Sequence, residues 1–77
     1  MITMTLLEKA ANRLIAKVRV RNLYPNSRKT NTELSAMVDI LKNMDFKVDY
    51  IWAENPEENK IVAITLTFEG NEIDRAA

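Results

Sequence analysis

Two runs of alternating apolar residues, one on each side of an acidic turn, constrain the fold of this chain most. Side chains of the same parity share one face of a strand. The two sets are Phe46, Val48, Tyr50 and Trp52, then Val62, Ile64, Leu66 and Phe68. A β-hairpin that turns at residues 56–58 pairs them in order, from Phe46 opposite Phe68 to Trp52 opposite Val62. A slip of one residue would turn the whole set toward water, so the pattern specifies this register.

The opposite face of the same hairpin is also apolar near the turn. Its residues there are Ile51, Ala53, Ile61 and Ala63, and with Trp52 they form the predicted protein interface. A two-stranded sheet is marginal alone and leaves two edges unpaired. We expect residues 1–4, a strand at 16–23 or a second copy of the chain to cover this end. Of the three we favour the second copy.

The first half of the chain has the spacing of two amphipathic helices. Thr5 with Glu8, and Thr30 with Glu33, have the spacing of capping boxes. The apolar stripes that follow are Leu7, Ala11, Leu14, Ile15 and Val18, then Leu34, Met37, Val38 and Leu41. One alternative stays open, because residues 17–21 alternate as a strand would and contain two valines.

These patterns predict an α+β fold in two layers, with the element order α-α-β-β. Both helices would pack on one face of the C-terminal antiparallel hairpin. The alternative order is α-β-α-β-β, with a strand at 16–23. We expect one domain over residues 1–77, with 1–4 as a flexible end or strap and 71–77 as a polar tail anchored by Ile73.

The composition excludes several kinds of site. The 77 residues contain no cysteine and no histidine, which removes thiol and imidazole chemistry and zinc fingers. The single glycine, Gly70, is incompatible with glycine-rich phosphate loops. We therefore predict no enzymatic activity, no cofactor, no metal and no small-molecule substrate. Without a signal peptide or a long apolar run, the expected location is cytoplasmic and away from membranes.

Charge is distributed unevenly along the chain. Residues 1–30 contain seven Lys and Arg against one Glu, whereas residues 31–77 contain four basic and ten acidic residues. The basic residues that could grip nucleic-acid phosphates are Lys9, Arg13, Lys17, Arg21, Arg28 and Lys29. The competing interpretation is a solvated helix face that is attracted to the acidic second half of the chain.

Acidic residues form two groups in the second half. They are Glu54, Glu57 and Glu58 at the turn, and Glu69, Glu72 and Asp74 near the end. Their spacing differs from that of calcium-binding loops, so we interpret the first group as keeping the hairpin tip solvated. Together the two groups suggest a third function, an acidic mimic that occupies the nucleic-acid site of another protein.

The leading functional hypothesis is a small non-enzymatic protein-interaction module. We expect a homodimer, since small domains without staples often gain stability by association, and a role as adaptor or inhibitor of a larger, unidentified protein. The alternatives are a nucleic-acid-binding module and an acidic mimic. The size and the asparagine content are compatible with accessory proteins of phages or mobile elements.

Overall fold

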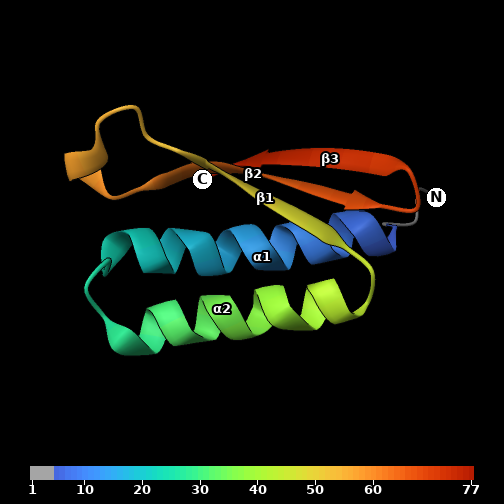
Figure 1. Ribbon diagram of the computed structural model, residues 1–77, viewed down its shortest axis with the longest axis horizontal. Helices are drawn as coiled ribbons and strands as arrows, with labels where there is room; N and C mark the ends of the chain where they lie inside the picture. The colour runs from blue at the N-terminus through green and yellow to red at the C-terminus, as the bar shows by residue number, and fades with distance from the viewer. Residues whose placement is uncertain (1–4) are drawn as a thin grey trace.

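The computed structural model describes residues 5–77, which form two helices followed by a three-stranded antiparallel sheet (Figure 1). The elements are α1 (Leu6–Leu23), α2 (Arg28–Asn43), β1 (Lys47–Trp52), the short 3-10 helix η1 (Pro56–Glu58), β2 (Ile61–Phe68) and β3 (Asn71–Ala76). The strand order is β1-β2-β3, so β2 is central. The predicted α+β class, with two N-terminal helices on one face of a C-terminal hairpin, is confirmed.

Capping explains where the first helix begins. The Thr5 Oγ1 accepts a hydrogen bond from the Glu8 backbone N–H at 3.1 Å, and the Glu8 Oε1 accepts one from the Thr5 N–H at 3.3 Å. This is the predicted capping box. The helix continues to Leu23, so the alternative strand at 16–23 is wrong. Val18 stays helical because it is fully buried in the core, where tertiary packing outweighs its weak helix propensity.

The second helix begins earlier than its predicted cap. Ser27 is the N-cap, and its side chain accepts from the Thr30 N–H at 3.3 Å. Thr30 instead donates its hydroxyl to the Tyr24 carbonyl at 3.1 Å, and Glu33 pairs with Lys17. The capping box predicted for Thr30 and Glu33 therefore does not form, because both side chains have other partners.

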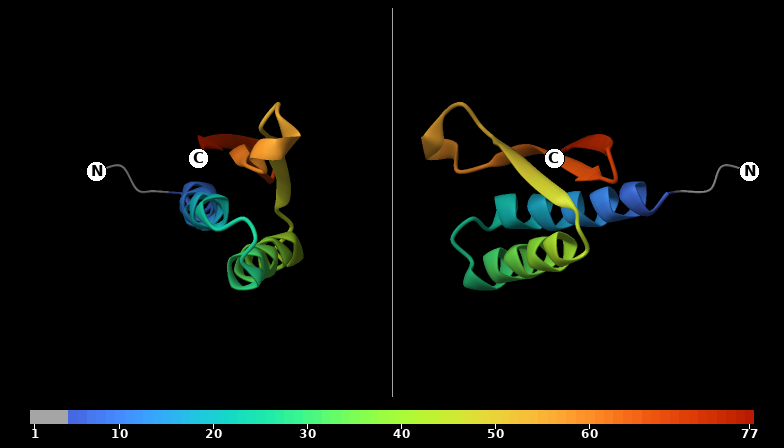
Figure 2. Two further views of the ribbon diagram at one scale, coloured as in Figure 1. Left: turned by 90° about the vertical axis from the view of Figure 1, so that its left-hand side faces the viewer. Right: turned by 45° about the vertical axis from the view of Figure 1, so that its right-hand side comes forward.

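The core lies between the helices and the inner face of the sheet. Its residues are Ala10, Ala11, Leu14, Ile15, Val18, Leu34, Val38, Leu41, Phe46, Ile61, Ile64 and Leu66. Fully burying one Leu or Ile side chain stabilises the fold by about 1.5–3 kcal/mol. In the left view of Figure 2, α1 lies close beneath the sheet, whereas α2 lies farther from it, below β1. The inner face of β1 is consequently covered less completely than that of β2.

A β-bulge changes the predicted hairpin register near its turn. Val48 pairs with Leu66 and Tyr50 with Ile64, as predicted. The register then shifts between Ile51 and Trp52, and Trp52 faces Ile61. The predicted pair of Trp52 with Val62 is therefore wrong. An extra residue reverses parity beyond it, which turns Ile61 into the core.

At the other end of the hairpin the register holds. The Phe46 and Phe68 rings stack with centroids 4.3 Å apart and planes 20° from parallel. An offset stack of this kind contributes beyond the area that it buries. The predicted proximity of these two aromatic residues is confirmed.

The C-terminal residues form a strand where a polar tail was expected. Glu69 and Gly70 both have positive φ, 49° and 79°, which is the backbone of a tight type I′ hairpin turn. In β3, Ile73 pairs with Leu66 and packs against the core, and Asp74 pairs with Thr65. The expectation of a tail at 71–77 is wrong, although its predicted anchor Ile73 does contact the core.

Candidate functional site

The six predicted phosphate-binding residues do not form one surface. Lys9 and Arg13 are exposed on the first half of α1, while Arg28 and Lys29 are exposed at the start of α2. Since the two helices run in opposite directions, these pairs lie at opposite ends of the molecule (Figure 1). The remaining two residues, Lys17 and Arg21, contact other side chains of the chain.

Lys17 spans the seam between the helices. Its Nζ lies 3.3 Å from Glu33 Oε2, and both side chains are 40% exposed. Among residues 5–77 the other ion pair is Lys47 with Asp49, at 4.0 Å within β1. The predicted attraction between the basic and acidic halves is thus represented by one direct contact, the Lys17–Glu33 pair.

Arg21 is a buried cation at the end of α1, only 6% exposed. Its guanidinium donates to the Asn59 carbonyl at 2.6 Å and to Asn59 Oδ1 at 2.7 Å, and its Nε donates to Asn31 Oδ1 at 3.2 Å. It also lies over the Trp52 ring, 5.2 Å from the centroid. Because its partners are neutral oxygens and an aromatic face, Arg21 joins the end of α1 to the hairpin tip and is not free to bind phosphate.

The next residue adds a second connection to the tip. Asn22 Nδ2 donates to the Ile61 carbonyl at 2.8 Å, and Asn22 Oδ1 accepts from the Ile61 N–H at 3.0 Å. One amide side chain thereby satisfies both backbone groups of Ile61, which is 1% exposed. Since a buried backbone group without a partner is destabilising, this pair of bonds allows the bulged end of β2 to be buried.

Trp52 contacts this network, although 51% of its surface is exposed. Its ring is held between the Arg21 guanidinium and Tyr50, whose ring meets it edge-on at 86° with centroids 6.2 Å apart. Burial raises the pKa of the Tyr50 phenol, and the positive charge of Arg21 partly offsets that rise. Trp52 therefore presents a large aromatic surface whose orientation is fixed.

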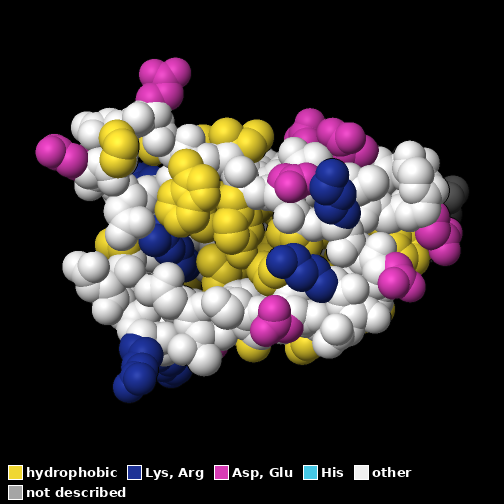
Figure 3. Space-filling view, viewed as in Figure 1, with side chains coloured by type: hydrophobic (Ala, Val, Ile, Leu, Met, Phe, Trp, Pro, Cys, Tyr) yellow, Lys and Arg dark blue, Asp and Glu magenta, His cyan; other side chains and the backbone are white. Residues whose placement is uncertain are grey.

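The five residues predicted as a protein interface are divided by the bulge. Ile51 and Trp52 are exposed, Ala53 and Ala63 are partly exposed, and Ile61 belongs to the core. Including Ile61 in the interface was an error of parity, because the bulge exposes Val62 in its place. Figure 3 shows apolar side chains gathered on one face beside β1, with charged side chains around them.

We define the tip surface as four of the large apolar residues exposed toward this end of the molecule, namely Leu23, Ile51, Trp52 and Val62. Ile51 and Trp52 are consecutive in β1 and therefore lie on opposite faces of the sheet. Leu23 and Val62 line a hollow of about 410 Å³ next to Asn22 and the end of β3. Sequence reasoning missed Leu23 because it is not on the apolar stripe predicted for the first helix. It missed Val62 because nothing in the alternation marks the bulge.

The acidic residues remain in two groups. Glu54, Glu57 and Glu58 are exposed at the tip, where Asn55 Oδ1 accepts from the Glu57 N–H at 3.0 Å. Glu69 and Glu72 lie at the other end of β2, and Asp74 Oδ1 accepts a hydrogen bond from the Thr65 hydroxyl at 2.7 Å. Over residues 5–77, no three acidic side chains come together in a way that could hold a metal ion.

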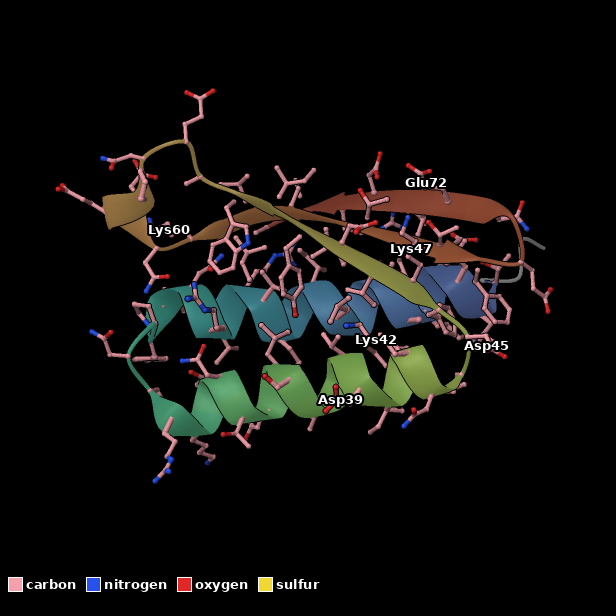
Figure 4. The ribbon with its side chains drawn as sticks, in the orientation of Figure 1. Asp39, Lys42, Asp45, Lys47, Lys60 and Glu72 are labelled. Carbon is pink, nitrogen blue, oxygen red and sulfur yellow. The ribbon has the colours of Figure 1, made fainter. Side chains whose placement is uncertain are left out.

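Charges of both signs are spread along the molecule. In Figure 4, Lys60 lies at the tip end of the long axis, whereas Lys42, Asp45 and Lys47 lie toward the other end. Lys47 is next to Asp49, and Lys42 follows Asp39 by one helical turn. Lys and Asp residues therefore lie close together toward that end, and neither sign prevails among these labelled residues.

The chain has no match among protein-family models, curated proteins or solved structures. Within residues 5–77, neither helix has the length and apolar character required to cross a lipid bilayer.

Proposed function

We propose that this protein is a non-enzymatic protein-interaction module that uses the tip surface to pair with a second copy and acts as an adaptor or inhibitor of a larger protein. The observation that supports this most is the state of Trp52. Half of its surface is exposed, yet its ring is held by Arg21 and Tyr50.

A fixed aromatic side chain is well suited to binding. Interfaces obtain most of their affinity from a few residues, among which Trp and Tyr are enriched. A ring that is already oriented loses little conformational entropy when a partner covers it. Ile51, Leu23 and Val62 add apolar area at the same end of the molecule.

A second copy of the chain is the partner that we favour for this surface. A domain of this size buries a modest share of its surface, so its stability margin is small. Covering exposed Ile51, Trp52 and Val62 would add apolar burial that the single chain lacks.

Trp52 is the sole tryptophan, so its fluorescence reports directly on this surface. We expect sedimentation equilibrium between about 10 µM and about 1 mM to give a mass that rises from monomer to dimer. The emission of Trp52 should shift to the blue over the same range. Ile51→Lys and Val62→Lys should abolish both changes while the circular dichroism of the helices stays the same.

Asn43→Lys is the matched control, since it adds the same charge at an exposed position at the far end of α2. It should associate as the wild type does. A monomeric mass and constant Trp52 emission at every concentration would refute the self-association. Association that persists in both tip variants would mean that another surface carries it.

A further inference from the structure

A second apolar surface lies between the start of α1 and the end of α2, and these helix ends are opposite the hairpin tip in Figure 1. It is a groove of about 310 Å³, and the residues that matter for its chemistry are Leu6, Lys9, Arg13, Met37, Ile40 and Met44. Leu6, Ile40 and Met44 are exposed, Ile40 to 60%. Below them, Ala10, Leu41 and Phe46 are buried and form the floor.

The two sides of this groove, which we call the helix groove, differ in charge. The α1 side carries Lys9 and Arg13, and neither forms an ion pair with any of residues 5–77. The α2 side carries Ile40, which is apolar. Lys17 follows Lys9 and Arg13 at the same interval of four residues, and it binds the Glu33 carboxylate across the seam at 3.3 Å. The Lys17–Glu33 contact shows that a cation in this row of α1 can bind a carboxylate on a neighbouring helix.

We propose that the helix groove binds an acidic amphipathic helix of a partner protein. The apolar side chains of that helix would lie on the groove floor, and its carboxylates would bind Lys9 and Arg13. Leu6 and Arg13 are seven residues apart, so along α1 the groove extends about 10 Å. That length accommodates the i, i+3/i+4 and i+7 side chains through which helices bind grooves, and an Arg–carboxylate pair adds orientation.

The charges of α1 and α2 argue against a helix of a second copy in this groove. The two helices carry only three acidic residues. Glu8 is held in the capping box of α1 and Glu33 is paired with Lys17, so Asp39 alone would be available to the two cations. A helix that neutralises both Lys9 and Arg13 must therefore come from another protein, because a helix of a second copy would bring Asp39 alone.

The shape of the surface argues against a membrane. A helix that binds lipid lies in the plane of the interface and buries one apolar face of its own, whereas these apolar residues line a hollow between two helices. The proposal extends the suggested adaptor role, because the groove and the tip surface lie at opposite ends. It does not depend on self-association through the tip.

A random peptide library displayed on phage and selected on the immobilised full chain tests the chemistry directly. We expect the enriched peptides to be acidic and to carry apolar residues at helical spacing. Fluorescence anisotropy of one enriched synthetic peptide should give a Kd of about 1–100 µM. Lys9→Glu with Arg13→Glu should weaken binding at least about tenfold, and Ile40→Ser about fivefold.

Arg28→Glu with Lys29→Glu is the matched control, with the same change of charge on exposed residues at the other end of the molecule. It should keep the Kd within about twofold. Ile51→Lys should leave peptide binding unchanged, which separates this test from the test of the tip surface. All these variants change exposed side chains, and circular dichroism verifies their fold.

Several results would overturn the proposal. They are no enrichment, enrichment of neutral or basic peptides, and equal binding by the Lys9→Glu, Arg13→Glu variant and the control. Self-association that Ile40→Lys abolishes would make a second copy the occupant. Sedimentation with anionic phosphatidylserine vesicles that requires Lys9 and Arg13 would make it a membrane.

Discussion

The tip surface and the helix groove, the two exposed apolar surfaces of this protein, are held in place by different interactions. At the tip, Arg21 and Asn22 bind the hairpin through side-chain hydrogen bonds of 2.6–3.0 Å, and Trp52 is held in place. At the helix groove the side chains pack without such bonds, and Met37 and Met44 have flexible thioether chains. A fixed aromatic surface favours one partner geometry, whereas a methionine-lined groove tolerates several. The comparison suggests a specific contact at the tip and a more adaptable one at the groove.

Removing Arg21 should have the largest effect, because it deletes the interactions that hold the tip and are absent from the helix groove. Arg21→Ala deletes charged hydrogen bonds to Asn59 and the cation–π contact with Trp52, and we expect the free energy of unfolding to fall by about 2–3 kcal/mol. Trp52 should become more mobile, with a red-shifted emission. Urea denaturation followed by circular dichroism and by fluorescence measures both effects.

Arg28→Ala serves as the control, because it removes an exposed Arg at the start of α2. It should change stability by less than about 0.5 kcal/mol. If Arg21→Ala fails to fold, Arg21→Lys keeps the charge but not the planar fork, and an intermediate loss is expected. Equal stability of the Arg21→Lys variant and the wild type would show that the paired bonds to Asn59 contribute little.

The ion pair at the helix seam should contribute much less. Lys17 and Glu33 are both 40% exposed, so solvent screens their attraction. A double-mutant cycle with Lys17→Met and Glu33→Gln should give a coupling of about 0.2–1 kcal/mol that decreases in high salt. A coupling as large as the Arg21 effect would mean that the seam between the helices is held as firmly as the tip.

Periodicity was sufficient to predict most of the fold. The apolar stripes that begin at Leu7 and Leu34 predicted both helices, and the alternation from Phe46 to Phe68 predicted two strands. The third strand escaped prediction because Ile73 is its one large apolar residue. A strand of this kind is stabilised by its pairing with β2 and by the Glu69–Gly70 turn, not by its own pattern.

The tip network was harder to predict, although one signal was present. Arg21 follows Leu14 and Val18 at intervals of seven and three, which places it on the buried stripe of α1. Grouping it with exposed cations by the four-residue interval ignored that position. Its partner Asn59 comes from a distant turn that adopts a left-handed backbone, φ 50°, and helical spacing contains no information about that turn.

The smallest predicted effect concerns Tyr50, which connects Trp52 to the core. Burial raises the pKa of its phenol in the folded protein, so the unfolded chain releases this proton at a lower pH. The contribution of the neutral phenol is complete below the unfolded pKa, about 10, and is lost as the pH rises through the folded pKa. The free energy of unfolding should therefore fall more steeply above about pH 10 in the wild type than in Tyr50→Phe. Urea denaturation measures this fall, and each protein is compared with its own value at neutral pH. Parallel curves for the wild type and Tyr50→Phe would show that the Tyr50 phenol is as accessible to water as it is in the unfolded chain, and that the Trp52 ring lacks a fixed neighbour on that side.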